Sequence, residues 1–300
     1  MKLLFVVNPI SGGVDKKPFL REAESLCNNY GIEYSIFKTT GVNDEEGVKK
    51  IIDEFQPNKV ASVGGDGTTL FTAIALLETK IPMGIIPLGS ANGMAVELFV
   101  NPKPIEALKN IIMSDVIGHL DMVKVNGEHY SIHIGDVGIN AQIVEAYDKD
   151  ENRGMVTYAK YFIDEVKKVD LIHVAINANG KSIDKSGIMV CICNSRKYGT
   201  GVPINLTGNP MDGKFEIVVV KKIDTNSIIK AGLSKFEEGF YDRENIEILS
   251  TDKAQLSFDK PRLLQLDGEV IGKYKDIEVE ILSGGVNLIS TKNSLSSIVK

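Results

Sequence analysis

In the first hundred residues, short apolar runs alternate with segments in which apolar residues recur at helical spacing. Four short apolar runs predict buried strands, at residues 2–8, 33–39, 59–64 and 83–89. Apolar residues at helical spacing follow each run, over residues 16–30, 48–55, 68–78 and 91–98. Strands that alternate with helices are typical of a parallel sheet covered by helices. We therefore predict an α/β domain over residues 1–119.

The pattern changes near residue 120, where shorter alternating runs begin. Asn126-Gly127 and Asn179-Gly180 each stand between two such runs, which is a strong signal for a β-hairpin. Further short strands are predicted at 188–194, 214–220, 254–258, 262–266 and 276–282, with helices at about 155–168 and 226–238. We predict a mainly antiparallel β-domain over residues 120–300. The sequence does not decide whether the last ~15 residues return to the first domain.

Composition and charge narrow the function classes. The net charge of −6 argues against nucleic acid as a partner and against strong attraction to anionic membranes. Three Lys-Lys pairs, at 16–17, 167–168 and 221–222, are expected to be solvated. Three cysteines are too few for a disulfide framework, and we expect Cys191 and Cys193 to be buried in a strand. The N-terminal apolar run is too short for a signal peptide, and no apolar stretch approaches the ~18 residues of a membrane span, so we expect a cytoplasmic protein.

Polar or glycine-rich loops follow all four strands of the predicted α/β domain, at 8–13, 39–41, 64–68 and 89–92. Ligands bind at this end of the strands in such sheets. In "GGDGT" (64–68) the glycines admit a phosphate, but Asp66 has the wrong sign for one. A Mg²⁺ ion between carboxylate and phosphate would explain it. Thr68 could cap the following helix while also offering its hydroxyl to a ligand. Capping alone would explain Ser90 before the next helix, but its position beside the other loops favours a functional role.

Acidic turns mark the second half. Asp212-Gly213 precedes a strong strand, and Asp267 and Glu269 flank Gly268. Taken alone these are tight turns, but near a phosphate they would suit a metal ligand and a general base. His129 and His133 stand four apart in a strand and are expected to be structural or solvent-facing. "GKS" at 180–182 lacks the first glycine of a P-loop and lies in a hairpin.

The ordered motifs "NPISGG", "GGDGT", "PLGSAN", "MDGKFEIVVV" and "LDGE" resemble the diacylglycerol kinase catalytic family, which includes bacterial lipid kinases and the sphingosine and ceramide kinases. The resemblance covers nearly the whole chain. "GGDGT" alone is shared with NAD kinases and phosphofructokinases. The resemblance implies a nucleotide-binding α/β domain of the phosphofructokinase and NAD kinase type. It also implies a β-sandwich-like domain after it, with the active site in the cleft between the two.

The resemblance also implies roles for individual residues. The residues implied to bind nucleotide are Asn8, Ser11, Gly12, Thr40, Gly64, Gly65, Asp66, Gly67, Thr68, Ser90 and Asn92. Asp212 with the carbonyls of Asn209 and Lys214 matches a metal site, and Asp121 an acidic position that supports it. Either Glu269 or Asp267 matches the base that takes the proton from the lipid hydroxyl, and Asp66 acts in catalysis by organising Mg²⁺.

The sequence departs from the family at three positions. Leu70 and Phe71 stand where members often carry Asn-Glu. Gly93 stands where the family has an aspartate. Glu97 lies one helical turn later on the same face, and we hypothesise that it substitutes for the missing acid.

The leading hypothesis is an ATP- and Mg²⁺-dependent lipid kinase of phospholipid metabolism. It would transfer the γ-phosphoryl group to the hydroxyl of a lipid such as diacylglycerol, while bound peripherally at the membrane surface. One alternative is NAD kinase-like phosphorylation of a soluble nucleotide, and another is a non-catalytic nucleotide-binding regulatory protein. The identity of the lipid stays open, and so does a homodimer, although relatives often dimerise.

Overall fold

The computed structural model describes residues 1–138, 170–197, 203–222 and 245–298. The chain forms two compact units, residues 1–122 with 283–300, and residues 123–282. The helices expected at 155–168 and 226–238 lie outside the described residues, as does the lysine pair at 167–168.

The first unit is built on a parallel sheet. Its strands are β1 (Lys2–Val7), β2 (Glu33–Lys38), β3 (Lys59–Gly64) and β4 (Met83–Pro87), in the spatial order β2-β1-β3-β4. The end of β14 (Glu269–Ser290) lies parallel to β4, with Leu288 opposite Met83. The four strands predicted from the apolar runs are confirmed.

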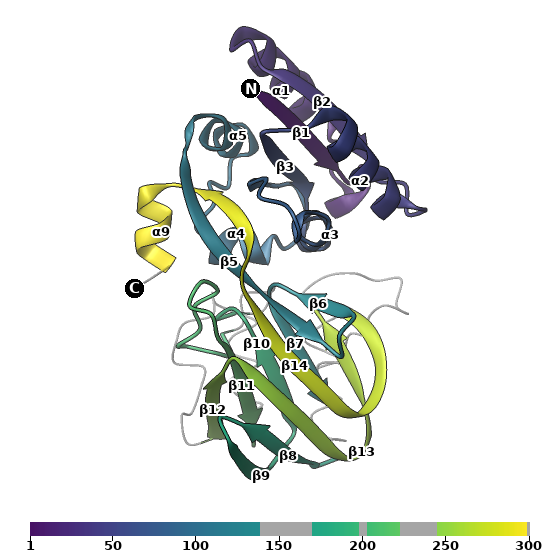
Figure 1. Cartoon of the computed structure of the whole chain (residues 1–300), viewed down its shortest axis with the longest axis vertical. Coiled ribbons are helices and arrows are strands. Elements are labelled where there is room, and N and C mark those ends of the chain that lie inside the picture. The colour runs from purple at the N-terminus through teal and green to yellow at the C-terminus, as the bar shows by residue number, and fades with distance from the viewer. Residues whose placement is uncertain (139–169, 198–202, 223–244, 299–300) are drawn as a thin grey trace. The chain divides into compact units, whose positions relative to one another are not determined.

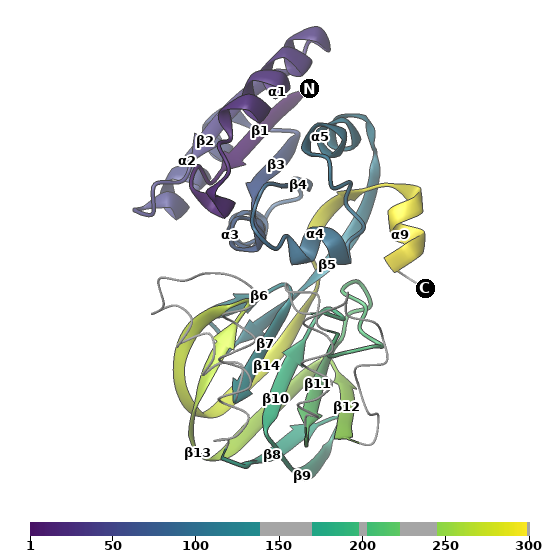
Figure 2. The same ribbon diagram turned by 180° about the vertical axis from the view of Figure 1, so that it is seen from behind.

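Helices cover both faces of this sheet (Figure 1). On one face α1 (Lys17–Asn29) and α5 (Pro104–Met113) pack with Leu3, Phe5 and Val7 of β1 in one apolar cluster. On the other face lie α2 (Asp44–Phe55) and α3 (Asp66–Leu76), as Figure 2 also shows. The continuous apolar run of β1, buried on both sides, is what lets the strand contact both layers of helices. Helix α5 was not predicted.

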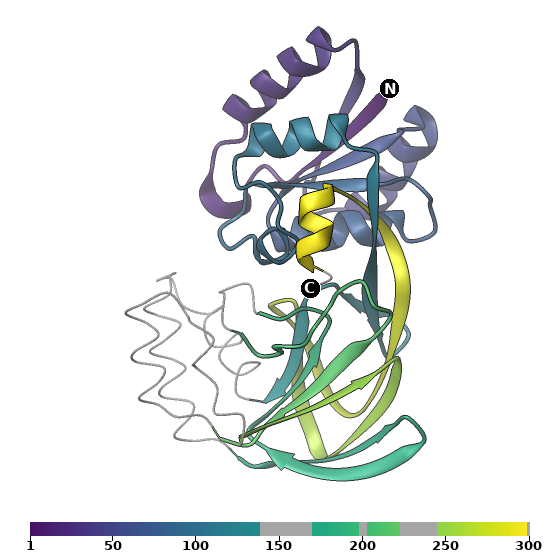
Figure 3. The same cartoon turned by 90° about the vertical axis from the view of Figure 1, so that its left-hand side faces the viewer.

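Three short helices complete the first unit: η1 (Ser11–Gly13), α4 (Gly93–Glu97) and α9 (Lys292–Ile298). The hydroxyl of Ser294 in α9 donates to the carbonyl of Phe99, which follows α4, at 3.0 Å. Figure 3 shows α9, in yellow, packed on this unit.

The second unit is an antiparallel sheet. Its central strands lie in the order β12-β11-β10-β7-β13, and their bounds are Ile246–Thr251, Phe215–Val220, Met189–Cys193, Ile134–Gly138 and Lys253–Leu266. Two hairpins are attached. In one, the end of β5 (Val116–Val125), a strand that begins in the first unit, pairs with β6 (His129–Ser131), and in the other β8 (Ile172–Ala178) pairs with β9 (Lys181–Gly187). Both Asn-Gly turns have positive φ, as that turn type requires.

One detail of this sheet differs from the sequence prediction, and another confirms it. The strands expected at 254–258 and 262–266 are one strand, β13, with an irregularity between Ser257 and Arg262. Cys191 and Cys193 are fully buried in β10, as predicted. Burial raises the pKa of the Cys193 thiol well above its usual value, which keeps it protonated and unreactive.

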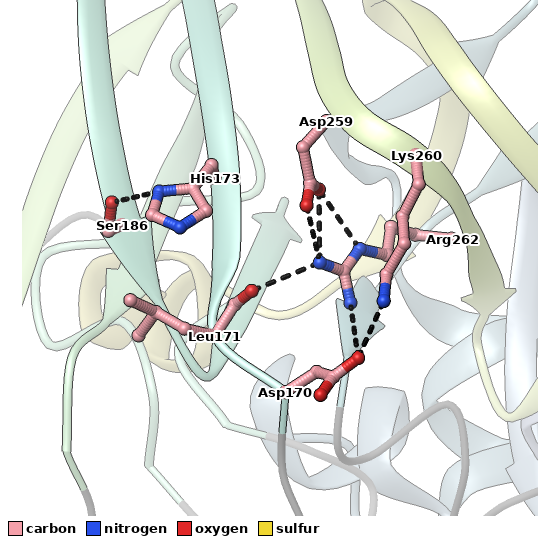
Figure 4. A network of polar contacts seen from close by, with 7 residues as sticks. All are labelled: Asp170, Leu171, His173, Ser186, Asp259, Lys260 and Arg262. Atoms are coloured by element: carbon pink, nitrogen blue, oxygen red, sulfur yellow. Dashed lines mark hydrogen bonds and ion pairs between the residues drawn. The ribbon is translucent and has the colours of Figure 1, made fainter.

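Arg262 fixes the irregularity in β13 (Figure 4). Its guanidinium donates to both carboxylate oxygens of Asp259 at 3.0 Å and to the carbonyl of Leu171 at 3.0 Å. Lys260 and Arg262 also face Asp170, at 2.6 and 4.0 Å. The side chain of Arg262 is 9% exposed, so the network ties the kinked strand to the start of β8.

Candidate active site

Three loops at the carboxyl ends of β1, β3 and β4 touch each other through backbone atoms. A Cβ on Gly12 would lie 2.7 Å from the carbonyl carbon of Gly89, and a Cβ on Gly65 would lie 3.2 Å from the Cα of Gly89. A Cβ on Gly89 would lie 2.8 Å from the Gly65 nitrogen. Real Cβ atoms essentially never approach another atom within 3.0 Å, so only glycine fits at positions 12 and 89, and a Cβ at position 65 would make an unusually tight contact. Three motifs far apart in the chain thus form one continuous backbone surface.

Asp66 links two of these loops. Its carboxylate oxygens accept the backbone N–H groups of Gly93 and Met94, each at 2.9 Å. These are orphan donors at the start of α4, so Asp66 acts as a cap supplied from another helix. The structure therefore gives this carboxylate a role that the sequence reasoning missed, beside the Mg²⁺ interpretation.

Neither expected hydroxyl cap is present. Helix α3 begins at Asp66, so Thr68 lies inside its first turn, and its Oγ1 is buried without a partner among the described residues. Helix α4 begins at Gly93 after Asn92, and Ser90 is an exposed residue ahead of it that caps nothing. Neither residue is therefore a helix cap, and the functional role expected of both stays a prediction. A buried unpartnered hydroxyl beside Gly64 is instead an unsatisfied group that a bound phosphate could complete.

The "NPISGG" loop is held by a buried lysine. The Asn8 side chain accepts the N–H of Ile10 at 3.1 Å, and the Ser11 hydroxyl lies 3.2 Å from the Asn8 carbonyl. The Lys16 ammonium donates to the carbonyls of Ser11 and of Val14. Lys16 is 3% exposed, and burial lowers the pKa of its ammonium. The expectation that Lys16 is solvated is wrong, whereas Lys17 is exposed as predicted.

Thr40 lies in an exposed loop after β2. Its N–H and hydroxyl donate to Asp44 at 2.8 and 3.0 Å, and the N–H of Gly41 donates at 2.7 Å. Burial alone would raise the pKa of Asp44, but these hydrogen bonds together lower it. The loop is thus ordered by the first residue of α2.

Asn92 and Glu97 frame α4. The Asn92 amide pairs with the N–H and the carbonyl of Gly89, at 2.8 and 3.0 Å, so it shapes the loop. Glu97 is 5% exposed and shares the buried side of α4 with Gly93. Glu97 and Gly93 therefore lie on the same face of α4, as expected. That Glu97 substitutes for the missing acid stays a prediction.

The residues expected to hold a metal fall in both units. Asp121 belongs to the first unit, is 1% exposed and accepts the N–H of Gly284 at 2.7 Å. Asn209, Asp212 and Lys214 form a turn of the second unit, in which side-chain oxygens accept nearby N–H groups at 3.1 and 3.0 Å. Within the described residues, no group of three or more His, Cys, Asp or Glu could hold a metal. Mg²⁺ does not need such a cage, since it is usually bound by one or two carboxylates with substrate phosphates and water.

The turn between β13 and β14 carries the "LDGE" motif. Asp267 accepts the Ser131 hydroxyl at 2.5 Å and the N–H groups of Ile132 and His133 at 2.9 and 3.2 Å. Burial raises the pKa of Asp267, against the opposing effects of His133 and of these hydrogen bonds. Glu269 is exposed, and within the described residues its carboxylate makes no hydrogen bond or ion pair.

Gln265 supports the same turn through its side-chain amide. Its amide oxygen accepts the N–H of Gly268 at 2.8 Å, and its amide nitrogen donates to the buried Asp136. The sequence did not identify Lys16, Gly89 or Gln265 as individual site residues. Only Gly89 gave a signal, as a glycine inside a motif; the other two look like ordinary surface or strand positions.

Comparison with known proteins agrees with this geometry. The diacylglycerol kinase catalytic domain family matches residues 2–125, and the YegS C-terminal NAD kinase beta sandwich-like domain family matches residues 134–290. The diacylglycerol kinase of Bacillus subtilis is 22% identical over 288 residues, which cover 91% of this chain and 94% of that protein. A protein of Yersinia pseudotuberculosis named "Probable lipid kinase YegS-like" is 25% identical over 90% of this chain and 92% of its own.

A solved structure shares the fold. The crystal structure of a diacylglycerol kinase from Bacillus anthracis superposes with a TM-score of 0.73 at 19% identity, covering 98% of each chain. It bears out the predicted α/β domain followed by an antiparallel β-domain. None of the helices in the described part of the chain is both long and apolar enough to span a bilayer. The chain belongs to the family that these two models describe, a diacylglycerol kinase catalytic domain followed by a YegS C-terminal NAD kinase beta sandwich-like domain.

Proposed function

We propose that this protein is an ATP- and Mg²⁺-dependent kinase that phosphorylates the hydroxyl of a lipid such as diacylglycerol, bound peripherally at a membrane surface. The observation that carries the proposal is the junction of Gly12, Gly65 and Gly89, where backbone replaces side chains at the ends of three parallel strands. Such a surface lets phosphates approach the backbone closely. Thr68, whose hydroxyl has no partner among the residues that the structure describes, lies at the same loops.

Asp66 fits a magnesium nucleotide as well as its capping role. Each carboxylate oxygen has a second lone pair beyond the N–H group that it accepts. When bound, Mg²⁺ offsets the charge of the β- and γ-phosphates. The capping bonds hold the carboxylate in one orientation, so it is ordered before the nucleotide arrives.

The two acids of "LDGE" have different roles in this proposal. Asp267 already accepts three hydrogen bonds and anchors the turn, which makes it a poor base. Glu269 has no such partner among the described residues and is exposed, so we assign it the proton of the lipid hydroxyl. The hydroxyl oxygen then attacks the γ-phosphorus, and ADP leaves with the bond electrons.

The test is transfer of ³²P from [γ-³²P]ATP to a panel of lipids, with NAD as a separate acceptor. We expect a labelled lipid phosphate that needs Mg²⁺ and is lost in Asp66→Ala. Glu269→Gln should lower kcat by about 10²–10⁴-fold, the usual contribution of a general base. Label in NAD alone would favour the soluble-nucleotide kinase, and nucleotide binding without any transfer would favour a regulatory protein.

A further inference from the structure

Beside the "LDGE" turn of the second unit lies a buried polar atom for which the described part of the chain offers no hydrogen-bond partner. His133, between β6 and β7, is 4% exposed, and its Nε2 makes no hydrogen bond within the described residues. Buried side-chain nitrogens are nearly always paired, because desolvation without a partner is unfavourable. Such an atom either meets a ligand or water or lowers the stability of the fold.

The backbone of His133 is fixed from two sides. Its N–H donates to Asp267 at 3.2 Å, and its carbonyl accepts the N–H groups of Asn194 and Ser195 at 2.9 and 3.2 Å. The Asn194 side chain adds a hydrogen bond to the carbonyl of Ile132 at 2.9 Å. Four hydrogen bonds therefore hold the backbone at Ile132 and His133 in place, and this fixes the point from which the buried imidazole extends.

The same contacts join His133 to the proposed base. Asp267 precedes Gly268 and Glu269 in a turn whose position depends on Ser131, Ile132 and His133. Any acceptor hydroxyl that reaches Glu269 brings the rest of its polar headgroup to the neighbourhood of this turn. A neutral imidazole can donate to a carbonyl or accept from a hydroxyl, depending on its tautomer.

We propose that His133 binds the acceptor lipid, its Nε2 forming a hydrogen bond with a second oxygen next to the reacting hydroxyl. This inference rests on the proposed lipid kinase function. It names the acceptor as a glycerolipid alcohol, in which an ester or hydroxyl oxygen adjoins the hydroxyl that is phosphorylated. A site built to hydrogen-bond an oxygen rejects analogues that lack it, because a buried polar group is then left unpaired.

The experiment compares two acceptors in mixed detergent micelles with [γ-³²P]ATP. Dioleoylglycerol carries the second oxygen, and oleyl alcohol lacks it. In His133→Phe we expect kcat/KM for dioleoylglycerol to fall about tenfold or more, with oleyl alcohol and the KM for ATP little changed. The Tm should stay equal or rise, because the substitution removes an unsatisfied polar atom and keeps a ring.

The matched control is His129→Phe in the same hairpin. The His129 Nε2 lies 3.2 Å from the Tyr274 hydroxyl, so this ring has a partner within the protein. We expect a lower Tm and an unchanged preference between the two acceptors. The pair of variants separates loss of a structural hydrogen bond from loss of a substrate contact.

Three outcomes would overturn the inference. If His133→Phe lowers the Tm and affects both acceptors equally, Nε2 is satisfied by water and is structural. Unchanged kinetics with both acceptors would show that it touches neither. If the wild-type protein labels no lipid, the proposed function itself fails, and the assignment of His133 fails with it.

Discussion

The junction of the three glycine loops can be tested by adding a single methyl group. In Gly89→Ala the new Cβ lies 2.8 Å from the Gly65 nitrogen, whereas an ordinary contact begins at 3.4 Å. The loops must separate by at least 0.6 Å, since the clashing atoms are backbone and cannot rotate away. Overpacking of this kind costs about 1–3 kcal/mol. For a unit of this size the Tm should fall by roughly 2–12 °C.

The same shift should affect nucleotide binding more than stability. The loops that move are those assigned to the phosphates, and a displacement near 1 Å can cost about 10²-fold in rate. We expect titration with MgATP to show weaker binding in Gly89→Ala, at temperatures where the variant is still folded by circular dichroism. The decrease should exceed what the loss of stability explains.

Gly67 provides the control within the "GGDGT" motif. A Cβ at this position meets nothing within 4 Å, and the residue lies in the first turn of α3. Gly67→Ala should therefore raise the unfolding free energy by about 0.5–1 kcal/mol, through helix propensity. If Gly89→Ala proved as stable as Gly67→Ala and bound MgATP like the wild type, the close junction of the loops would be wrong.

Three further changes test other parts of the structure. Asp66→Asn keeps one acceptor for the two N–H groups of α4, so we expect a stability loss of about 1 kcal/mol by urea denaturation; unchanged stability would exclude the capping role. Arg262→Met should lower the Tm by a few degrees in a thermal scan, and an unaltered Tm would show that the clasp on Asp259 is not stabilising. The Glu216 carboxyl group accepts hydrogen bonds from the Asn205 amide and the Ser250 hydroxyl. Burial nevertheless raises the pKa of Glu216, so ionisation of this group destabilises the fold. The stability of the wild type relative to Glu216→Gln should therefore fall as the pH rises above 4.5, and a pH-independent difference would contradict the raised pKa.

The fold could be predicted from the sequence because its periodicity is simple. Buried parallel strands such as Lys2–Val7 are continuous apolar runs, and Asn126-Gly127 fixes a hairpin locally. Helix α5 carries an apolar stripe but was not predicted, because the proline at its start, Pro104, is as typical of a turn as of the first residue of a helix. The single strand β13 was predicted as two strands because a kink held by Arg262 looks like a turn in the sequence.

The candidate site could be predicted only as a set of motifs. The glycines of "GGDGT" signalled a ligand loop, but no local pattern shows that Gly89 presses on Gly65, or that Asp66 caps a helix 27 residues later. Lys16 was expected to be solvated because a pair of like charges usually lies on a solvated face. Such contacts depend on which loops the topology brings together. Local sequence patterns do not show contacts between residues that are far apart in the chain.

The most direct test of the central claim is a crystal structure of the protein soaked with magnesium and a non-hydrolysable ATP analogue. We predict triphosphate density against Gly12, Gly65 and Gly89, with a magnesium ion touching the Asp66 carboxylate. A nucleotide bound elsewhere on the chain, with these loops in contact only with solvent, would contradict the account.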